Sequence, residues 1–562
     1  MKHRAHWLVV ALLAAAPLPA LALEAETVLI NGRIWTGNPR QPEASALAVW
    51  RGRVLAVGSD AEIRKLTGPA TAVINLQGRR VLPGFHDSHI HLLGSGQRLS
   101  QVQLKDAADE AVFAHRLQVF DRKLPRDRWL LGGEWDHDRT FGGTLPTAAL
   151  IDKYVPDRPV FLRRYDGHMA VVNSRVLRMA GITAKTPDPP GGVIYRLPNG
   201  EPSGVLRDNA MDLVTGKGLI PPISDEELAE SVRAALKEAR ELGVTSVQDM
   251  DGSDSATRRR LFRLYQQMHR NGQLTLRIDL RWPLAAWKEL ADLGVQEGFG
   301  NDWVRIGGLK GFIDGSLGSS TAKMFEPFVN EPDSTGVFVT QPAQLREWIR
   351  QADRAGLSVC VHAIGDRANS ELLDIYADVA RENGPRDRRF RIEHAQHFRP
   401  QDFKRCAELG VIASVQPYHI IDDGRWAEGR IGTRRCATSY ANRSFLDAGV
   451  HLAFGSDWSV APLSPLLGID AAVHRRTLDG KNPNGWFPEQ KISVAEAIKA
   501  YTLGSAYAAH QEAERGSLEV GKLADLVMLS RDILDPAEQD HIAETKVLLT
   551  MVGGRVVFSS DE

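Results

Sequence analysis

The 562-residue sequence predicts an α/β fold: a (β/α)8, TIM-like barrel, a small β-sandwich domain built from both chain ends, and an insertion after the first barrel strand. Between residues 81 and 509, eight short apolar runs alternate with helical patterns, which is typical of a closed parallel sheet. Residues 23–80 and 510–562 instead carry short β-rich runs broken by glycine. The stretch of about 99–222 is too long for one crossover, so we expect it to be the insertion.

The N-terminus has the pattern of a secretory signal peptide. Lys2 and Arg4 supply a positive start, residues 7–16 form an apolar run, and Ala20-Leu21-Ala22 fits a cleavage site of small residues. A membrane anchor is the alternative, but the run is shorter than the roughly 20 residues that a span needs. We therefore expect residues 1–22 to be removed on export, which leaves a periplasmic or secreted protein without a stable membrane span.

The two chain ends are expected to pair into one composite β domain, from 23–80 and 510–562. Residues 28–35 read as a hairpin with Asn31-Gly32 at its turn, and residues 46–57 read as a second hairpin. Similar β-rich runs return at 524–529 and 546–558. Two β-rich ends that flank a long α/β middle favour a small sandwich beside the barrel.

The middle of the chain supplies the strands and helices of the barrel. One helix is expected from Ser224, whose capping-box partner is Glu227, to the stop at Gly243, and another begins at Ser493. The expected barrel strands are 81–85, 244–248, 276–280, 304–308, 358–361, 390–393, 411–415 and 452–454.

Composition is ordinary for a soluble globular protein and excludes some functions. The hydrophobic fraction is 43%, the charged fraction is 25%, and the formal net charge is −1. No basic excess indicates nucleic-acid binding, and no charge block indicates a disordered tail. The three cysteines are too few for a disulfide-stapled fold, although a bridge between Cys406 and Cys436 stays open.

Two histidines separated by one residue, His89 and His91, follow the first predicted strand. On extended backbone, residues i and i+2 point to the same side, so both imidazoles can face one point in space. Neutral imidazole is a common ligand of zinc and of neighbouring transition metals. One such pair is weak evidence by itself, because histidines often lie near loops for other reasons.

Further metal-ligand residue types stand at other predicted strand ends. Lys310 follows the fourth strand, His362 and His394 end the fifth and sixth, and Asp457 follows the eighth. Active sites of such barrels lie at the C-terminal ends of the strands. Four histidines, a lysine and an aspartate in this position predict a metal centre in the barrel mouth.

Six segments carry a resemblance to a known family, and it covers nearly all of the chain after the signal peptide. Because these segments occur together, the sequence resembles the amidohydrolase superfamily, and it closely resembles the amidohydrolase-3 (YtcJ-like) branch of that superfamily. The segments are 29–34, 83–91, 314–318, 391–396, 455–458 and 516–525.

The resemblance implies a metal-dependent hydrolase with one or two divalent ions, zinc first among them. It implies that the metal ligands are His89, His91, Lys310, His362, His394 and Asp457. Lys310 has no lone pair as an ammonium, so it can ligate only as a CO2-derived carbamate, which accompanies two metals in binuclear relatives. The alternative is a plain ion pair between Lys310 and a nearby acid such as Asp314.

The implied reaction is hydrolysis of a carbon–nitrogen bond, amide, N-formyl or N-acyl, in a small molecule. The metal generates hydroxide near neutral pH, and Asp457 serves as the catalytic proton shuttle from water to the leaving nitrogen. His168 and Trp458 are expected substrate contacts. His397 competes with His394 for the sixth-strand role, whereas His86 is out of phase with His89.

Other readings remain open at this stage. Glu393 either holds an imidazole or faces away from the site, and Tyr418 and Trp426 either line the pocket or only pack. The same metal site can serve a lactonase, an esterase or a deaminase, and a non-enzymatic exported metal-binding protein is the further alternative. We expect the protein to bind a small-molecule substrate and not to bind nucleic acid. The oligomeric state stays open, with a homodimer as one possibility.

Overall fold

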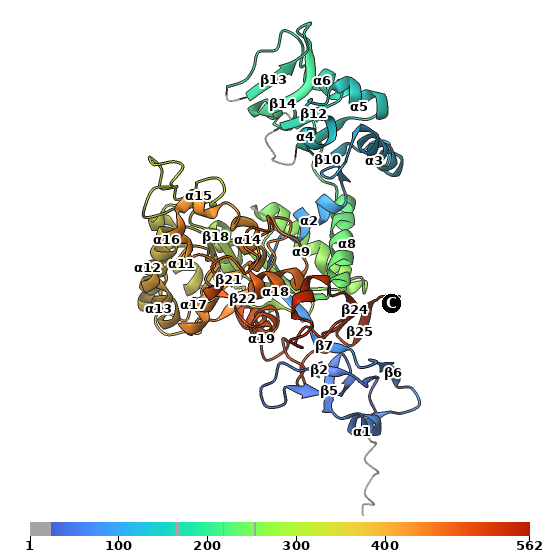
Figure 1. Cartoon of the computed structure of the whole chain (residues 1–562), viewed down its shortest axis with the longest axis vertical. Helices are drawn as coiled ribbons and strands as arrows, with labels where there is room; N and C mark the ends of the chain where they lie inside the picture. The colour runs from blue at the N-terminus through green and yellow to red at the C-terminus, as the bar shows by residue number, and fades with distance from the viewer. Residues whose placement is uncertain (1–23, 165–168, 191, 217, 252–253, 562) are drawn as a thin grey trace, which may run out of the picture.

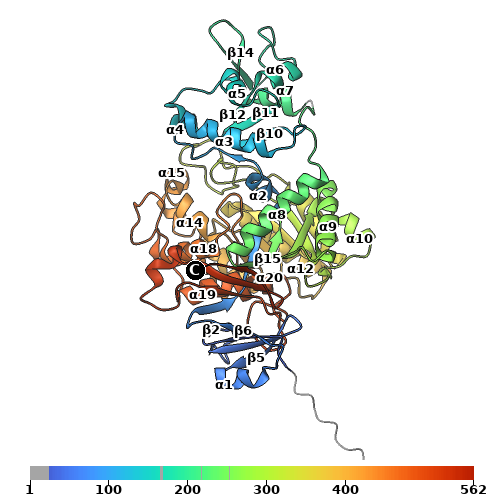
Figure 2. The ribbon, with the colours of Figure 1, turned by 90° about the vertical axis from the view of Figure 1, so that its right-hand side faces the viewer.

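The computed structural model describes residues 24–164, 169–190, 192–216, 218–251 and 254–561. Three parts are stacked along the long axis of the molecule (Figure 1): the insertion lies at one end, the barrel in the middle, and the β domain at the other end. The view turned by 90° shows the same order (Figure 2), so the insertion faces the barrel end that carries α2 (Leu92–Leu99).

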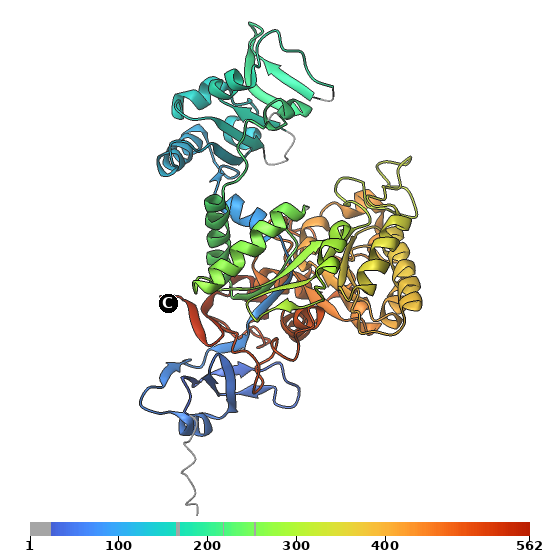
Figure 3. The same ribbon diagram turned by 180° about the vertical axis from the view of Figure 1, so that it is seen from behind.

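Eight parallel strands form the barrel, in chain order around the sheet. A parallel bridge between Ile90 and Trp458 brings the first strand against the chain that follows the last. The view from behind shows helices wrapped around these strands (Figure 3). The predicted barrel is confirmed, and its strands are β8 (Phe85–Ile90), β15 (Val244–Asp249), β16 (Arg277–Pro283), β18 (Val304–Phe312), β19 (Val359–Ala363), β20 (Arg391–His394), β21 (Ile412–Val415) and β22 (Leu452–Phe454).

Amphipathic helices cover the outside of the barrel. The helix that begins after Ser224 has the expected capping box with Glu227, and the one after Ser493 has its box with Glu496. Gly243, at φ 77°, lets the chain leave the first of these helices in a conformation that favours glycine. The main helices are α8 (Asp225–Glu241), α9 (Ser255–Arg270), α11 (Pro342–Arg354), α12 (Asp366–Asn383), α13 (Pro400–Glu408), α18 (Pro465–His474) and α19 (Val494–Lys499).

The first barrel strand lies one segment later than the sequence predicts. Residues 80–83 form β7 (Arg80–Pro83), which pairs with β2 (Arg33–Trp35) and β23 (Leu526–Leu529) in the β domain. The barrel strand is β8, which runs through the histidine motif itself. The apolar run before the histidine motif can be buried in the barrel sheet or in the sheet of the β domain, so its sequence alone does not predict which sheet it joins.

Both chain ends do build a β-sandwich. One sheet has the order β5-β4-β1-β6 and the other β25-β24-β23-β7-β2-β3. Leu29 and Val49 from the first sheet share a buried cluster with Leu526 and Met551 from the second. The remaining strands are β1 (Thr27–Ile30), β3 (Glu43–Ala44), β4 (Ala46–Trp50), β5 (Arg53–Gly58), β6 (Ala72–Asn75), β24 (Val547–Val552) and β25 (Arg555–Ser559).

One of the two predicted N-terminal hairpins is wrong. Strands β1 and β2 belong to different sheets, so Asn31-Gly32 turns the chain from one sheet to the other and does not close a hairpin. Asn31 has φ 57°, a left-handed conformation that asparagine tolerates, and its backbone N–H donates to Asp60. The second hairpin, β4 with β5, is confirmed.

The insertion has its own sheet and its own core. Its strand order is β13-β14-β12-β11-β10-β9, and the first three strands in the chain run parallel. Helices α3 (Glu110–Lys123), α5 (Ala148–Tyr154) and α6 (Ser174–Ala180) accompany this sheet. The strands are β9 (Val102–Gln103), β10 (Leu130–Trp135), β11 (Val160–Arg164), β12 (Met169–Val172), β13 (Gly192–Arg196) and β14 (Pro202–Asp208).

Two further predictions concern a disulfide bridge and membrane-spanning helices. Cys360, Cys406 and Cys436 are all free and buried, so the bridge between the last two is not formed. They pack as small core residues. Among the described helices, none is both long and apolar enough to cross a membrane. The predicted signal peptide at 1–22 lies outside the described residues.

Candidate metal centre

A cavity of about 460 Å³ opens at the C-terminal ends of the barrel strands. This is the end at which (β/α)8 barrels carry their chemistry, because the loops after all eight strands meet there. The lining combines six of the predicted ligand residues with residues from neighbouring loops: His89, His91, Lys310, Phe312, Ser316, Leu317, Gly318, His362, Ile364, His394, Gln396, His419, Asp422, Asp423, Trp426, Asp457 and Val460.

Backbone hydrogen bonds fix Asp457 beside the first two histidines. The Asp457 N–H donates to the carbonyl of His89 at 2.8 Å, and the His91 N–H donates to the carbonyl of Trp458 at 2.8 Å. The carboxylate of Asp87 accepts from the N–H groups of His89 and Ser456. The first and last strands are thereby joined at the point where the ligands stand.

The Asp457 carboxylate is the point at which four imidazoles converge. Its Oδ1 lies 3.3 Å from His91 Nε2 and 3.6 Å from His89 Nε2. Its Oδ2 lies 3.9 Å from His419 Nε2 and 4.0 Å from His394 Nδ1. Two groups with metal-binding geometry result, His89–His91–Asp457 and His394–His419–Asp457, each with its ligand atoms within 4.8 Å of one another.

His419 is a site residue that the sequence analysis missed. It lies on α14 (Pro417–Asp423), which begins two residues after strand β21, and its ring is buried. Its Nε2 atom has no hydrogen-bond partner among the described residues. The predicted ligands lie in barrel strands or shortly after them, whereas this histidine lies in the first turn of the helix after the seventh strand. The segment Gln416-Pro417-Tyr418-His419 was the available signal.

Glu393 contacts the Nδ1 atom of His89, so of its two possible roles it orients an imidazole and does not face away from the site. Its Oε2 lies 2.6 Å from His89 Nδ1, and its Oε1 lies 2.7 Å from the Arg391 guanidinium. Burial, followed by the nearby Lys310 charge, lowers the pKa of His89 to about 4, so the ring is neutral near pH 7. The His89 Nδ1–H therefore donates to Glu393, and the Nε2 lone pair faces the cavity.

The other two strand histidines are oriented by carbonyl oxygens. His394 Nδ1 donates to Gln416 Oε1 at 2.8 Å, and His362 Nε2 donates to the Gly315 carbonyl at 2.9 Å. Burial is the largest cause of a pKa well below normal at His394 and of a pKa of about 3 at His362. Their ring centroids are 4.5 Å apart. Each ring keeps one unprotonated nitrogen that can bind a metal ion.

The sequence predicts Lys310 just after the fourth barrel strand, but in the structure it lies inside that strand, β18. Its Nζ is 3.3 Å from His89 Nε2, and burial lowers its pKa. Asp314 accepts instead from the backbone N–H groups of Lys323, Ile364 and Gly365. The alternative of a Lys310–Asp314 ion pair is therefore not seen among the described residues.

The remaining candidates lie at other places. His397 Nδ1 contacts Ser439 Oγ at 2.7 Å, and His86 lies on the barrel floor, 3.4 Å from Gln248 Nε2. Neither lines the cavity. Trp458 packs in a buried cluster with Ile90 and does not line the cavity either. Trp426 does line it, whereas Tyr418 packs at the edge of a buried cluster. His168 lies outside the described residues.

The donor set fits a divalent metal ion. Several imidazoles, one carboxylate and the unpartnered Nε2 of buried His419 all face one cavity within the described part of the chain. Such nitrogen and oxygen donors suit zinc and similar ions, and a buried histidine nitrogen without a partner is otherwise unfavourable.

Comparison with known proteins agrees with this geometry. A sequence model described as "Amidohydrolase family" matches residues 72–558. "Protein LONG AFTER FAR-RED 3" of Arabidopsis thaliana is 40% identical over 96% of this chain and 93% of its own length. "Putative amidohydrolase YtcJ" of Bacillus subtilis is 33% identical over 94% and 98%. "N-substituted formamide deformylase" of Arthrobacter pascens is 26% identical over 94% and 97%.

A solved structure shows the same architecture. An uncharacterized metal-dependent hydrolase from Pyrococcus furiosus superposes with a TM-score of 0.74 at 30% identity, over 91% of this chain and 100% of its own. The predicted resemblance is thus confirmed over most of the chain. This chain belongs to the amidohydrolase family and is a metal-dependent hydrolase that acts on carbon–nitrogen bonds.

Proposed function

We propose that this protein hydrolyses the amide bond of a small N-formyl or N-acyl amine in the barrel-mouth cavity. The observation that carries the proposal is the contact of the Asp457 carboxylate with four imidazoles. The relative named as a formamide deformylase supports this bond type over the lactonase, esterase and deaminase alternatives. The cavity of about 460 Å³ beside the donor set argues against a purely structural metal-binding protein, because structural sites close their coordination shell with protein ligands.

The metal would be held by His89, His91, His362, His394 and Asp457, with His419 beside them, and zinc suits this set. When bound, such an ion lowers the pKa of water and polarises a substrate carbonyl. Two groups of ligands that share Asp457 favour two ions over one.

The carbamate on Lys310 is part of this proposal. Carbamate formation needs a neutral amine, which attacks CO2 and loses a proton. Burial lowers the pKa of Lys310 and thereby favours the neutral form. Its position 3.3 Å from His89 Nε2 places the modified group among the ligands. The carbamate would supply two oxygen atoms where the structure otherwise offers one carboxylate.

Asp457 serves as the proton shuttle. Burial raises its pKa, but the hydrogen bond from His91 and the surrounding imidazoles outweigh burial and hold its pKa well below the usual value. It is therefore ionised and can accept the proton of the attacking water. It then donates this proton to the leaving nitrogen, since a protonated amine leaves more easily than an amide anion.

The cavity walls limit the substrate to a small molecule. Phe312, Leu317 and Trp426 supply apolar surface, while Asp422 and Asp423 supply carboxylates. A volume of about 460 Å³ accommodates a drug-sized ligand rather than a polymer. An amide with one apolar substituent and one donor group fits this lining best.

Export is proposed on the sequence of residues 1–22 alone. Expression of the full chain in a bacterium, followed by mass analysis of the N-terminus in the periplasmic fraction, tests it. A mature chain that begins within a few residues of Ala22 supports export. An intact Met1 in the cytoplasm contradicts it.

The function is tested by metal analysis and turnover on the same preparation. We expect about two divalent ions per chain, a carbamate on Lys310 in non-denaturing mass analysis, and hydrolysis of N-formyl or N-acyl amines. Asp457→Asn should lower kcat by about 10²–10⁴-fold. The matched control is Asp447→Asn, at the exposed end of α17 (Asn442–Asp447), which should turn over normally. Activity on esters or ring amines alone would contradict the assigned bond type.

A further inference from the structure

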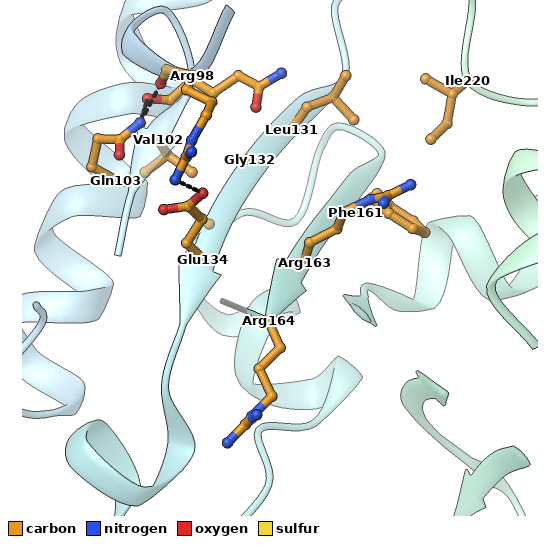
Figure 4. A pocket seen from close by; sticks show the side chains of 12 residues that line it. Arg98, Val102, Gln103, Leu131, Gly132, Glu134, Phe161, Arg163, Arg164 and Ile220 are labelled. Carbon is orange, nitrogen blue, oxygen red and sulfur yellow. Dashed lines mark hydrogen bonds and ion pairs between the residues drawn. The ribbon is translucent and has the colours of Figure 1, made fainter. Parts of the chain in front are cut away.

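We propose that the insertion carries a second binding site, which takes a small organic carboxylate with an apolar body. A cavity of about 340 Å³ lies between the end of α2 and the sheet of the insertion (Figure 4). It shares no lining residue with the metal cavity. Its volume falls in the range of small-molecule sites.

The floor of this cavity is bare backbone at the middle of β10. Gly132 and Gly133 have φ of 108° and 105°, a region that favours glycine. A Cβ on Gly132 would lie 2.7 Å from the Gln101 Cβ, and one on Gly133 would lie 3.1 Å from the Arg163 carbonyl oxygen. The pairing register with β11 shifts just after these glycines. The close approach of the neighbouring strands therefore requires both glycines, and the absence of side chains here leaves the β10 backbone open to the cavity.

The strand direction places one edge of the cavity at the carboxyl end of β11. Strands β9, β10 and β11 are parallel, and the lining includes the last two residues of β11, Arg163 and Arg164. In open sheets of parallel strands, ligands bind in the crevice at the carboxyl ends. The arginine edge of the cavity therefore lies at such an end, while its floor is the middle of β10.

The charges around the cavity favour an anion. Three arginines line it against one carboxylate, Glu134. Arg98 is already paired with Glu134, and Arg164 Nε lies 3.3 Å from His137 Nδ1. Arg163 is exposed, its guanidinium lies 5.8 Å from the Phe161 ring, and no ion pair engages it within the described parts of the chain. A carboxylate can accept two hydrogen bonds from such a planar guanidinium.

The opposite wall is apolar, which specifies the rest of the ligand. Figure 4 shows Leu131 and Ile220 at one end of the cavity, with Phe161 beside the Arg163 guanidinium. An aromatic or branched group packs against these side chains while its carboxylate reaches Arg163. A flat aryl carboxylate with a short linker has this shape.

Arg98 joins this site to the metal centre. Its guanidinium donates to the Ser459 carbonyl at 2.8 Å and pairs with Glu134 on the insertion. Ser459 is two residues after Asp457, and α2 begins directly after His91. A ligand in the cavity therefore touches a residue that contacts the catalytic loop, and binding can be read out at both places.

The test uses the full-length metal-loaded protein and 4-fluorophenylacetate, observed by fluorine NMR. We expect saturable binding that weakens at least tenfold in Arg163→Gln and returns in Arg163→Lys. The matched control is Arg122→Gln, an exposed arginine on α3 that does not line the cavity and should bind normally. The neutral amide, 4-fluorophenylacetamide, should bind at least tenfold more weakly than the acid.

Three results would overturn the proposal. Carboxylates also bind metal ions, so binding that persists in Arg163→Gln but disappears when a chelator removes the metal assigns the probe to the metal cavity. Equal binding by Arg163→Gln and Arg122→Gln, or no binding of the acid at millimolar concentration, shows that the insertion cavity has no such site. Because Arg163 is exposed, its replacement should leave folding intact, which a thermal melt checks.

Discussion

Glu393 and His89 form a fully buried pair, 2.6 Å between Oε2 and Nδ1, and neither side chain is exposed to solvent. Arg391 contacts the other carboxylate oxygen at 2.7 Å. The chain Arg391–Glu393–His89 thus runs from the barrel interior to the metal cavity and fixes both the tautomer and the direction of one ligand.

Glu393→Gln is the first prediction. The change keeps the shape but removes the charge that orients His89 and neutralises Arg391, so metal affinity should fall about 10–100-fold. Competition with a chromophoric chelator measures this affinity. Glu408→Gln, on the outside of α13, is the control and should bind metal like the native protein. Equal affinities in the two variants would show that the buried pair does not support the ligand.

His91 leads to a prediction about proton release. Burial lowers its pKa, but hydrogen bonds to Asp251 and Asp457 outweigh burial and raise its pKa to about 9. In the metal-free protein below pH 9 the ring therefore carries a proton, and a metal ion must displace it. Uptake of metal at pH 7.5 should release about one proton from this group, and at pH 10 none.

Calorimetric titration with zinc in buffers of different ionisation enthalpy measures the proton count. Apparent affinity should also rise about tenfold per pH unit between pH 7 and 9, because the proton competes with the metal. Asp251→Asn removes one of the two carboxylates near His91, 3.4 Å from its Nδ1, and should reduce the release at pH 7.5. A pH-independent affinity would contradict the assigned protonation of His91.

Local patterns were sufficient to predict the barrel and most of the site. The capping boxes at Ser224 and Ser493 are short-range features and form where the sequence indicates. The six predicted ligands line one cavity, although Lys310 lies inside β18 and His89 inside β8 rather than after a strand. Sheet membership was less predictable. Residues 80–83 were expected in the barrel and residues 33–35 in a hairpin, but the two segments pair with each other in one sheet of the β domain. The local sequence pattern does not distinguish these sheets, so long-range pairing decides where each strand lies.

The missed and the uncertain site residues have one cause. Side chains that reach a site from a helix, such as His419, do not follow the two-residue period of a strand. The role of Glu393 was open for a related reason. His394 has φ 74°, which breaks the strand alternation, so adjacent residues both contribute to the site. An alternating pattern predicts that only one of them does so.

The joint between the barrel and the β domain gives a stability prediction. Arg277 on β16 and Asp525, just before β23, form two hydrogen bonds of 2.7 and 2.9 Å and are both buried. Asp525→Ala leaves the Arg277 charge buried and unpaired, and should cost about 3–5 kcal/mol of the free energy of unfolding.

Urea unfolding followed by circular dichroism measures this loss. The double variant Arg277→Met with Asp525→Leu removes both charges and should be less destabilised than Asp525→Ala, because no unpaired charge remains. Arg33→Gln provides a comparison at an exposed ion pair with Asp532, where the change should stay within about 1 kcal/mol. A double variant that is as unstable as the single one would show that packing, and not charge, dominates this joint.

His419 tests whether the site holds one ion or two. Its Nε2 lies 3.9 Å from Asp457 Oδ2, and it belongs to the second of the two ligand groups, together with His394. His419→Asn should therefore reduce the metal content from about two ions per chain toward one if the ring is a ligand of the second ion. If the ring contacts substrate instead, metal content should stay constant while kcat/KM falls. His397→Asn is the matched control, because its buried ring contacts Ser439 and does not line the cavity. If the control also loses metal, the effect comes from a disturbed fold, and the assignment of His419 as a metal ligand loses its support.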